Sequence, residues 1–351
     1  MNVTLGVLLI ASAISPRNAF ADAISLDAIV HDYALREHFM GTVLVARGSD
    51  VLLRKGYGFS DRAGGAANGV MTRYEVASVT KLFTATAIFQ LREQGMLRLE
   101  DYVAMYVPSW PRQFSGVTIS ELLTHTSGLP DTPFPRSCTM AEILPELSRA
   151  RPEFAPGRGQ RYNNTAFRIL GAVIARIAKQ SYGDYLKRRI FAPLQMHDTG
   201  FDAIGPTAVG HHWSRGRFAE VKNDVVCRED SAAGLQTTVD DLYRFDRGLS
   251  SRTILGNESM RVMFTKIAGE HAYGWRVGTR YGRRYEEHGG IISGFASDFT
   301  RYPDEDACII VLGNAQGEDA RTLSNRLAAA LFDDARNEPP IPGNETIEDR
   351  H

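Results

Sequence analysis

The sequence predicts an α+β fold, an α/β sandwich in which both ends of the chain contribute strands to one antiparallel sheet. Three observations predict it. Runs rich in Val, Leu and Ile occur near both ends of the chain, patterns typical of helices dominate the middle, and no internal repeat interrupts this order. Because a sheet must bury its faces against other elements, one sheet flanked by helices is an economical arrangement. The middle of the chain then forms a mainly helical inserted lobe.

The first predicted elements are a helix and a β-hairpin. Ile24–His38 has the pattern of an amphipathic helix, and the β-rich runs Gly41–Ala46 and Val51–Phe59 are separated by a short turn signal. A long helical pattern then starts near Ser78 and stops at Gly95. Since this helix is apolar on most faces, we expect it to be buried at the centre of the protein.

The rest of the chain passes through helices and returns to strands. The middle includes helical patterns at Thr165–Lys179 and Val239–Leu249. Strands and a last helix follow at Tyr273–Arg280, Arg284–Glu287, Gly294–Tyr302, Ala307–Leu312 and Ala320–Phe332.

These elements suggest two lobes that together form one domain. Residues 22–95 with 255–335 would make the α/β lobe, 96–254 the helical lobe, and 336–351 a disordered tail. A cleft between such lobes is a natural place for a small-molecule site.

Composition restricts the range of functions. Of the 351 residues, 43% are hydrophobic and 23% are charged, as in an ordinary globular protein. The 40 Lys and Arg residues balance 41 Asp and Glu residues, which leaves a net charge of −1. No long basic run stands out, so a nucleic-acid partner has little support.

The first residues are typical of an export signal. Val3–Ile14 is apolar and too short for a membrane span, and Ala19-Phe20-Ala21 offers a cleavage pattern. We therefore expect residues 1–21 to be a signal peptide, no stable membrane span, and a periplasmic or secreted protein. Because no Lys or Arg precedes the apolar run, an upstream start codon or an N-terminal helix is the alternative.

The three cysteines do not form a metal-binding pattern. Cys308 lies in an apolar run, where a buried inert thiol is expected. Cys138 and Cys227 lie in polar stretches, and whether they pair stays open. The chain also lacks a P-loop, a dinucleotide fingerprint, Gly-x-Ser-x-Gly and His-Glu-x-x-His. We expect no cofactor and no metal.

Ser78 and Lys81 form the only Ser-x-x-Lys pair in the chain. Residues three apart at the start of a helix lie on one face, so the lysine nitrogen can approach the serine hydroxyl. A lysine in a partly dry cleft has a lowered pKa and can act as a base. The alternative is a helix-capping serine followed by a solvated lysine, but this pair opens the most apolar helix in the chain.

Two further motifs carry polar groups of the same chemistry. Tyr162 and Asn164 form the only Tyr-x-Asn, where a phenol beside a lysine can be partly ionised and shuttle a proton. The structural alternative is an asparagine helix cap with a packed tyrosine. His288-Gly289-Gly290 combines a histidine that could exchange protons near neutral pH with glycines that permit close approach of a strand. A tight turn between strands is the alternative there.

These motifs, in this order, resemble the Ser-x-x-Lys, Tyr-x-Asn and Lys/His-x-Gly signature of the class C β-lactamase-like, penicillin-recognising serine hydrolases. This family includes β-lactamases, DD-peptidases, related esterases and D-aminopeptidases. Other segments resemble it too, and together they span roughly residues 25–335: Leu122–Pro130, Ala233–Leu242, Tyr273–Trp275 and His288–Phe295. The resemblance implies a β-lactamase/transpeptidase-like fold.

The resemblance also implies roles for the site residues. Ser78 would be the acylated nucleophile, Lys81 its activating partner, and Tyr162 a base that also protonates the leaving group. Asn164 would hold the carbonyl side of the substrate, and the backbone N–H groups of Ser78 and Ile291 would form the oxyanion hole. Whether the lysine or the tyrosine takes the first proton stays open.

One departure from the family affects the expected substrate. Class C β-lactamases resemble one another in having Lys-Thr-Gly where this chain has His288, Gly289 and Gly290. A mostly neutral imidazole is a poorer partner for a carboxylate than a fixed ammonium. We therefore expect a serine hydrolase that acts through an acyl-enzyme on esters or small amides.

Two other functions stay open. The chain could be a D-stereospecific peptidase, a DD-carboxypeptidase or a weak β-lactamase. It could also be a non-catalytic sensor of muropeptides or β-lactams that is acylated and then stalls. The expected partner is in each case a small ester, amide or peptide, and the oligomeric state is open.

Overall fold

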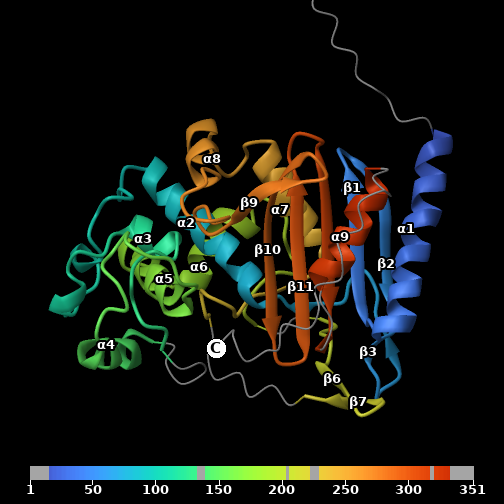
Figure 1. Ribbon diagram of the computed structural model, residues 1–351, viewed down its shortest axis with the longest axis horizontal. Coiled ribbons are helices and arrows are strands. Elements are labelled where there is room, and N and C mark those ends of the chain that lie inside the picture. Colours follow the sequence, from blue (N-terminus) through green and yellow to red (C-terminus); the bar gives the residue numbers. More distant parts are fainter. Residues whose placement is uncertain (1–15, 133–138, 203–204, 222–228, 317–319, 333–351) are drawn as a thin grey trace, which may run out of the picture.

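The computed structural model describes residues 16–132, 139–202, 205–221, 229–316 and 320–332. Its centre is a six-stranded antiparallel sheet with the strand order β2-β1-β12-β11-β10-β9 (Figure 1). The strands are β1 (Gly41–Arg47), β2 (Asp50–Tyr57), β9 (Arg276–Arg280), β10 (Arg283–Ile292), β11 (Phe295–Tyr302) and β12 (Ala307–Gly313). Strands from both chain ends therefore share one sheet, which confirms the predicted α+β fold.

The pairing of β1 with β12 joins the two ends of the chain. The two strands pair along their whole length, from Gly41 opposite Gly313 to Arg47 opposite Ala307. All residues of β11 and β12 are buried. A strand buried on both faces reads as a continuous apolar run, as β12 does, because helices cover both sides of the sheet.

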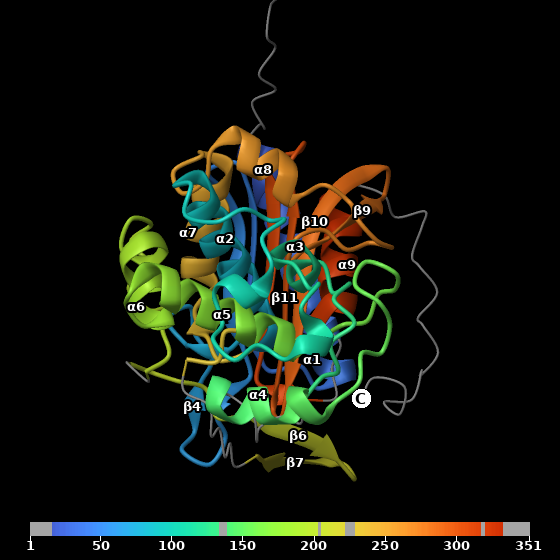
Figure 2. The same ribbon diagram turned by 90° about the vertical axis from the view of Figure 1, so that its left-hand side faces the viewer.

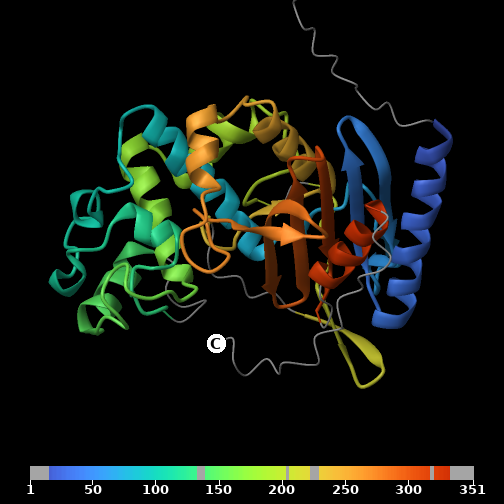
Figure 3. The same cartoon turned by 45° about the horizontal axis from the view of Figure 1, so that its top comes forward.

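Helices lie on both faces of the sheet (Figures 1 and 3). On one face, α1 (Pro16–Glu37) packs on β2 and on α9 (Ala320–Leu331), which in turn packs on β11 and β12. On the other face, α7 (Val239–Ser250) packs on β1 and β12. Each face of the sheet has its own hydrophobic core. Successive side chains of a strand point to opposite faces, so Ile310 of β12 packs in one core and Ile309 in the other.

Helix α2 (Thr80–Glu93) lies at the centre of the molecule. All residues from Thr80 to Leu91 are buried, which confirms the prediction of a buried central helix. It packs against α5 (Asn164–Ala178), α6 (Tyr182–Leu186) and α8 (Asn257–Met263). The helices α3 (Ile119–Leu123) and α4 (Met140–Arg149) lie further from the sheet (Figures 1 and 2). The site described below forms at the N-terminal end of α2.

Short elements complete the described chain. The remaining strands are β3 (Phe59–Asp61), β4 (Ala66–Ala67), β5 (Tyr74–Glu75), β6 (His211–Ser214), β7 (Arg217–Glu220), β8 (Gln236–Thr237) and β13 (Ala315–Gln316). The remaining helices are the 3₁₀ turns η1 (Ala77–Val79), η2 (Val103–Met105) and η3 (Arg112–Phe114), and the π-helical η4 (Lys187–Phe191).

Two element boundaries differ most from the prediction. Helix α1 begins at Pro16, well before the predicted start at Ile24, and it includes the predicted cleavage pattern. Strand β10 continues through His288 and both following glycines to Ile292, because β11 pairs with it over this whole stretch. The alternative of a tight turn at the glycine pair is therefore wrong.

Some predictions fall outside the described residues. These are the apolar run Val3–Ile14, the tail 336–351, and the pairing of Cys138 with Cys227. Cys308, in contrast, is described, and it is a free and buried thiol as predicted. No helix in the described ranges combines the length and the apolar character that crossing a membrane requires. The lobe boundaries at residues 95 and 255 stay a prediction.

Candidate active site

The hydroxyl of Ser78 lies at the entrance to α2. Ser78 is in the middle of η1, and the residue before it, Ala77, has a backbone φ of 45°. Such positive values are uncommon for residues other than glycine and occur often at functional sites. Ser78 Oγ lies 3.0 Å from Lys81 Nζ and accepts a hydrogen bond of 2.7 Å from the Tyr162 hydroxyl. The structure therefore brings the three predicted groups to one point.

Lys81 is held by three oxygen atoms. Besides its contact with Ser78, its Nζ donates hydrogen bonds to Asn164 Oδ1 at 2.8 Å and to Ala232 O at 2.9 Å. The side chain is fully buried. Desolvation lowers the pKa of Lys81 to about 7, although the negative charges of Asp230 and Asp131 act in the opposite direction. The predicted lowering of this pKa is confirmed, and its main cause is burial.

The contacts of Lys81 suit both of its protonation states. A protonated amine has three N–H donors, which match the three oxygens around it. A neutral amine keeps two donors for Asn164 and Ala232, and its lone pair can accept the hydroxyl proton of Ser78. A proton can therefore pass from Ser78 to Lys81 without any change in the position of the surrounding heavy atoms.

Tyr162 lies just before α5 and reaches across to Ser78. About 40% of its surface is exposed, which places the phenol at the border between the site and solvent. Lys81 Nζ lies 4.8 Å from the centre of its ring. Desolvation nevertheless raises the pKa of Tyr162, and the hydrogen bond to Ser78 offsets only part of this effect. The prediction that the phenol is partly ionised is therefore wrong, because desolvation disfavours the phenolate.

The two asparagines after Tyr162 have different functions. Asn163 is the N-cap of α5, and its side chain accepts a hydrogen bond from Ala166 N. Its own backbone N–H donates to His125 Nδ1, which gives this histidine a structural role. Asn164, one residue further, faces Lys81. The capping alternative thus applies to Asn163 and leaves Asn164 free for the site.

His288 contributes a neutral imidazole. It lies on β10, is buried, and its ring centre is 6.3 Å from that of Tyr162. Its Nδ1 donates to Gly289 O at 2.6 Å, because a carbonyl oxygen can only accept. Desolvation and, secondarily, the charge of Lys81 lower the pKa of His288 well below its usual value. The prediction that His288 exchanges protons near neutral pH is therefore wrong. The other expectation, a neutral imidazole, agrees with this lowered pKa.

Gly290 allows β10 to approach Ser78. A Cβ atom at this position would lie 2.3 Å from Val76 O and 2.9 Å from Ser78 N, which real structures do not tolerate. Pairing with β9 ends at Glu287, so the following part of β10 is a free edge toward η1. Ile291 lies on this edge. The backbone N–H groups of Ser78, in η1, and of Ile291, on β10, therefore belong to segments that lie next to each other.

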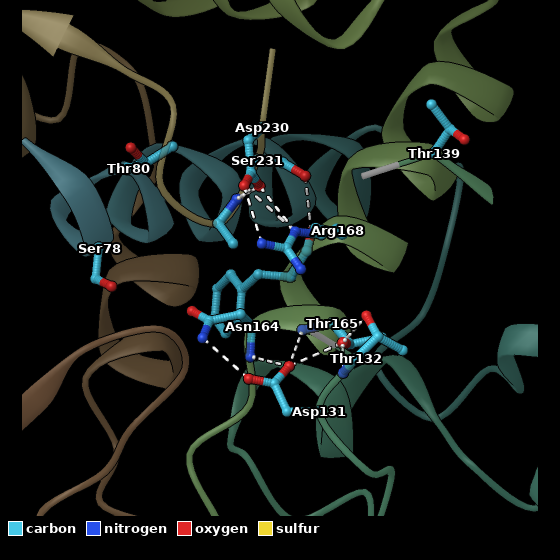
Figure 4. Close-up of polar contacts among 12 residues, drawn as sticks. Ser78, Thr80, Asp131, Thr132, Thr139, Asn164, Thr165, Arg168, Asp230 and Ser231 are labelled. Carbon is cyan, nitrogen blue, oxygen red and sulfur yellow. Dashed lines mark hydrogen bonds and ion pairs between the residues drawn. The ribbon is translucent and has the colours of Figure 1, made fainter. Parts of the chain in front are cut away.

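Several residues that support this site were not predicted from the sequence. Asp230 and Arg168 form a buried ion pair (Figure 4). Asp230 Oδ1 also accepts from Ala232 N at 2.9 Å. This contact fixes the turn whose carbonyl holds Lys81. Asp131 contacts Asn164 from the other side (Figure 4). Only their positions in the sequence could have pointed to Asp131 and Ala232. Asp131 directly follows the family-like segment Leu122–Pro130, and Ala232 directly precedes the segment Ala233–Leu242.

The described residues offer other features that do not belong to the site. A cavity of about 1010 Å³ lies between α7, α8 and the start of β10, and none of the site residues lines it. In the described ranges no group of three or more His, Cys, Asp or Glu side chains is arranged to hold a metal ion. Adjacent histidines in a stretch rich in Gly and Arg are typical of an exposed loop, but His211 and His212 lie on β6, and His211 is buried.

Comparison with known proteins identifies similar sequences. The profile of the family described as Beta-lactamase matches residues 26–333. The chain is 28% identical to "Penicillin-binding protein 4*" of Bacillus subtilis (strain 168) over 346 residues, which covers 88% of this chain and 76% of that protein. It is 26% identical to "Protein flp" of Staphylococcus aureus (strain MW2), with 89% and 67% covered.

Solved structures with a similar fold include a penicillin binding protein and a hydrolase. A penicillin binding protein from Bacillus halodurans superposes with a TM-score of 0.78 at 26% identity, and the match covers 87% of this chain and 98% of that one. EstCE1, described as a hydrolase with promiscuous acyltransferase activity, superposes with a TM-score of 0.79 and covers 90% and 100%. At 19% identity, the second match bears on the fold alone.

Proposed function

The chain belongs to the beta-lactamase family of serine hydrolases, and from this premise we propose that it hydrolyses esters or small amides through an acyl-enzyme on Ser78. The observation that carries the proposal is the position of Ser78 Oγ between Lys81 Nζ, at 3.0 Å, and the Tyr162 hydroxyl, at 2.7 Å. A nucleophile within hydrogen-bonding distance of a base and a proton donor is the arrangement that acyl transfer requires.

Neutral Lys81 acts as the base in the first step. It accepts the proton of Ser78 as Oγ forms a bond to the substrate carbonyl carbon, and the carbonyl electrons move to the oxygen. The N–H groups of Ser78 and Ile291 stabilise this oxyanion. With a pKa of about 7, a large fraction of Lys81 is neutral at physiological pH, whereas Tyr162 keeps its proton. These two pKa values favour Lys81 over Tyr162 as the first base.

Tyr162 completes the transfer of the proton. As the bond to the leaving group breaks, its hydroxyl donates a proton to the departing oxygen or nitrogen and regains one from Lys81. A water molecule then attacks the acyl-enzyme, its proton is taken up by the same pair, and Ser78 recovers its own. The protein ends each cycle in its starting protonation state.

The neutral state of His288 supports esters and small amides over carboxylate-bearing substrates. A β-lactam or a D-Ala terminus presents a carboxylate, which a fixed ammonium binds well and a neutral imidazole binds weakly. Esters and simple amides need no such partner. The histidine is therefore compatible with hydrolysis of neutral substrates.

The first test is covalent labelling of the nucleophile. A fluorophosphonate probe is expected to label the native protein and to leave Ser78→Ala unlabelled. Ser49→Ala, in the exposed turn between β1 and β2, is a matched control and keeps full labelling. Labelling that persists in Ser78→Ala would contradict the proposal.

A second test identifies the substrate and separates turnover from binding. Short p-nitrophenyl esters, D-Ala-D-Ala peptides and a chromogenic cephalosporin are compared with native protein and Ser78→Ala. We expect the esters to be turned over fastest. Stoichiometric acylation without turnover, seen as a stable mass adduct, would instead identify a sensor.

We also propose that the protein is exported to the periplasm or secreted. The apolar run at Val3–Ile14 and the small residues before Asp22 support this proposal. The N-terminal sequence of protein recovered from the periplasm or the medium tests it. A mature chain beginning at Asp22 is expected, and a protein that stays in the cytoplasm with Met1 intact would contradict export.

A further inference from the structure

We infer that Asp131 is a positioning residue, which fixes the side-chain amide of Asn164 so that its oxygen faces Lys81. The inference rests on the proposed function, since it assigns a task within the same site. It concerns a carboxylate from the loop after α3, which contacts the N-terminal end of α5.

Asp131 makes four hydrogen bonds to two consecutive residues. Its Oδ1 accepts from Asn164 N at 3.0 Å, from Thr165 N at 2.8 Å and from Thr165 Oγ1 at 2.8 Å. Its Oδ2 accepts from Asn164 Nδ2 at 3.0 Å. Figure 4 shows this carboxylate below the Asn164 and Thr165 side chains. One oxygen thus serves the end of the helix, and the other serves the amide of Asn164.

The second contact determines which way the amide points. An ionised carboxylate has only acceptors, and an amide NH₂ group has only donors. The Nδ2 atom must therefore face Asp131, and Oδ1 must face the opposite side, where Lys81 Nζ lies at 2.8 Å. An asparagine without such a neighbour could adopt either orientation.

The orientation of Asn164 decides what the lone pair of Lys81 is used for. With Oδ1 and the Ala232 carbonyl as its neighbours, neutral Lys81 donates to both and keeps its lone pair for the proton of Ser78. In the opposite orientation, Nδ2 of Asn164 would donate to that lone pair. The amine would then be occupied by the amide and could not accept the proton of Ser78.

The charge of Asp131 acts on the same lysine. It raises the pKa of Lys81 and so works against desolvation, which is the larger effect. Removing the charge while the shape is kept is therefore expected to move the pKa of Lys81 further down. This effect and the orientation of Asn164 can be measured separately.

Asp131→Asn keeps the shape of the side chain at position 131 but is expected to change the orientation of the Asn164 amide. Three donors surround the position of Oδ1, so the oxygen of the new asparagine is expected to stay there. Its NH₂ group then takes the place of Oδ2 and faces Nδ2 of Asn164. Two donors cannot pair, so the amide of Asn164 is expected to turn around.

Thr165→Val is the matched control. It removes the Thr165 hydroxyl bond to Asp131 and the Thr165 contacts with Thr132, so it weakens the same end of α5. It leaves the contact between Asp131 Oδ2 and Asn164 Nδ2 in place. A purely structural role of Asp131 predicts that both variants lose stability and activity together.

The readout is kcat/KM for a p-nitrophenyl ester as a function of pH, measured well below the unfolding temperature of each variant. In Asp131→Asn the plateau is expected to fall about 10- to 100-fold, the size of effect that misplacement of a reacting group produces. The acidic limb of the profile is expected to move to lower pH, because the pKa of Lys81 falls. Thr165→Val is expected to keep both the plateau and the limb.

A second measurement uses only stability and applies even where activity is lost. Asn164→Asp places a carboxylate against Asp131, and adding Asp131→Asn removes this repulsion. Asp131→Asn should therefore lower the unfolding temperature less in the Asn164→Asp background than in the native one. An equal decrease in both backgrounds would overturn the inference.

Other outcomes are equally decisive. A native-like pH profile for Asp131→Asn, or an equal loss of activity in Thr165→Val, would assign Asp131 to the helix end alone. A native protein that neither reacts with the fluorophosphonate nor hydrolyses any ester would instead overturn the proposed function itself.

Discussion

The pKa of Lys81 sets the pH at which the proposed nucleophile is activated. Burial lowers this pKa from its usual 10.5 to about 7, so the base form is gained as pH rises through 7. We therefore expect kcat/KM to increase with pH along a limb centred near 7 and then to level off. Hydrolysis of a neutral p-nitrophenyl ester between pH 5 and 9 measures it.

Two variants test the assignment of this limb. Lys81→Ala should lose the limb together with most of the activity, whereas Lys179→Gln, at the far end of α5, should keep the native profile. A limb near 10, or one that persists in Lys81→Ala, would contradict the role of Lys81 as the base.

Tyr162 is expected to matter most where the leaving group needs a proton. Tyr162→Phe removes the hydroxyl that contacts Ser78 but keeps the ring beside Lys81. A p-nitrophenolate leaves without protonation, so its ester should be less affected than an amide, for which loss of general acid catalysis costs about 100- to 10,000-fold. Comparing an ester and an anilide with the same acyl group measures this difference. Equal losses for both substrates would contradict the proposed role.

Sequence reasoning could find the residues with reactive side chains but not those that hold them. Ser78, Lys81, Tyr162 and Asn164 carry recognisable chemistry at recognisable spacing, and the structure brings them together. Ala232 could not be found in this way, because it acts through a backbone carbonyl, which every residue has. The sequence led to the expectation of a mostly neutral imidazole at His288, but the burial that lowers its pKa depends on the fold.

At the scale of elements, the approach of β10 to η1 forms one wall of the site. Gly290→Ala places a Cβ atom 2.3 Å from Val76 O, so one of the two backbones must move. We expect turnover of an ester and labelling by the fluorophosphonate to fall about 100-fold or more, the usual cost of losing one oxyanion donor.

The adjacent glycine provides a matched control. A Cβ atom on Gly289 would have no neighbour closer than 3.4 Å, which is ordinary contact. Gly289→Ala should therefore keep most of the activity and of the labelling. Equal losses in the two variants would mean that the strand as a whole, and not its approach to Ser78, is sensitive to substitution.

This strand also shows why element boundaries were harder to predict than elements. Two consecutive glycines favour a turn when only local preferences are considered. Here β11 supplies a partner on one side, so β10 continues past both glycines to Ile292. Similarly, local patterns predicted α1 from Ile24, although the helix begins at Pro16. In β10, pairing with another segment of the chain decides where the strand ends.

At the scale of the whole molecule, the shared sheet was predictable because hydrophobic runs at both chain ends need a common partner. The register of β1 on β12 was not, since both strands are buried on both faces and their apolar patterns fit several alignments. Helix α7 likewise belongs by sequence to the helical middle, yet it packs directly on β1 and β12. A buried ion-pair network joins the same helix to the neighbouring strands β10 and β11.

Arg301 is the centre of this network. It lies on β11, is buried, and its guanidinium donates to Asp246 at 2.6 Å and to Glu286 at 2.8 Å. Its third contact, at 2.8 Å, is with Ser250 Oγ. Because Asp246 and Ser250 lie on α7 and Glu286 on β10, one side chain joins the helix to two strands.

Removing this cation should leave two buried carboxylates with too few partners. Arg301→Met keeps most of the volume, so the loss in the free energy of unfolding is expected to be about 3 kcal/mol, at the low end for a broken buried pair. The low end applies because Arg247 still pairs with Asp246 and Arg284 with Glu286. The midpoint of urea unfolding measures the loss.

The pH dependence of this loss distinguishes charge from packing. Burial already raises the pKa of Glu286 while Arg301 holds it down, so removing the arginine raises this pKa further. The folded variant then binds a proton that the unfolded chain releases, and its deficit in stability should shrink as pH falls and grow as pH rises. Arg261→Gln, which breaks the exposed pair with Glu258, should leave the midpoint unchanged. A deficit in Arg301→Met that is the same at pH 5 and pH 8 would mean that lost packing, and not the buried charge, holds α7 on the sheet.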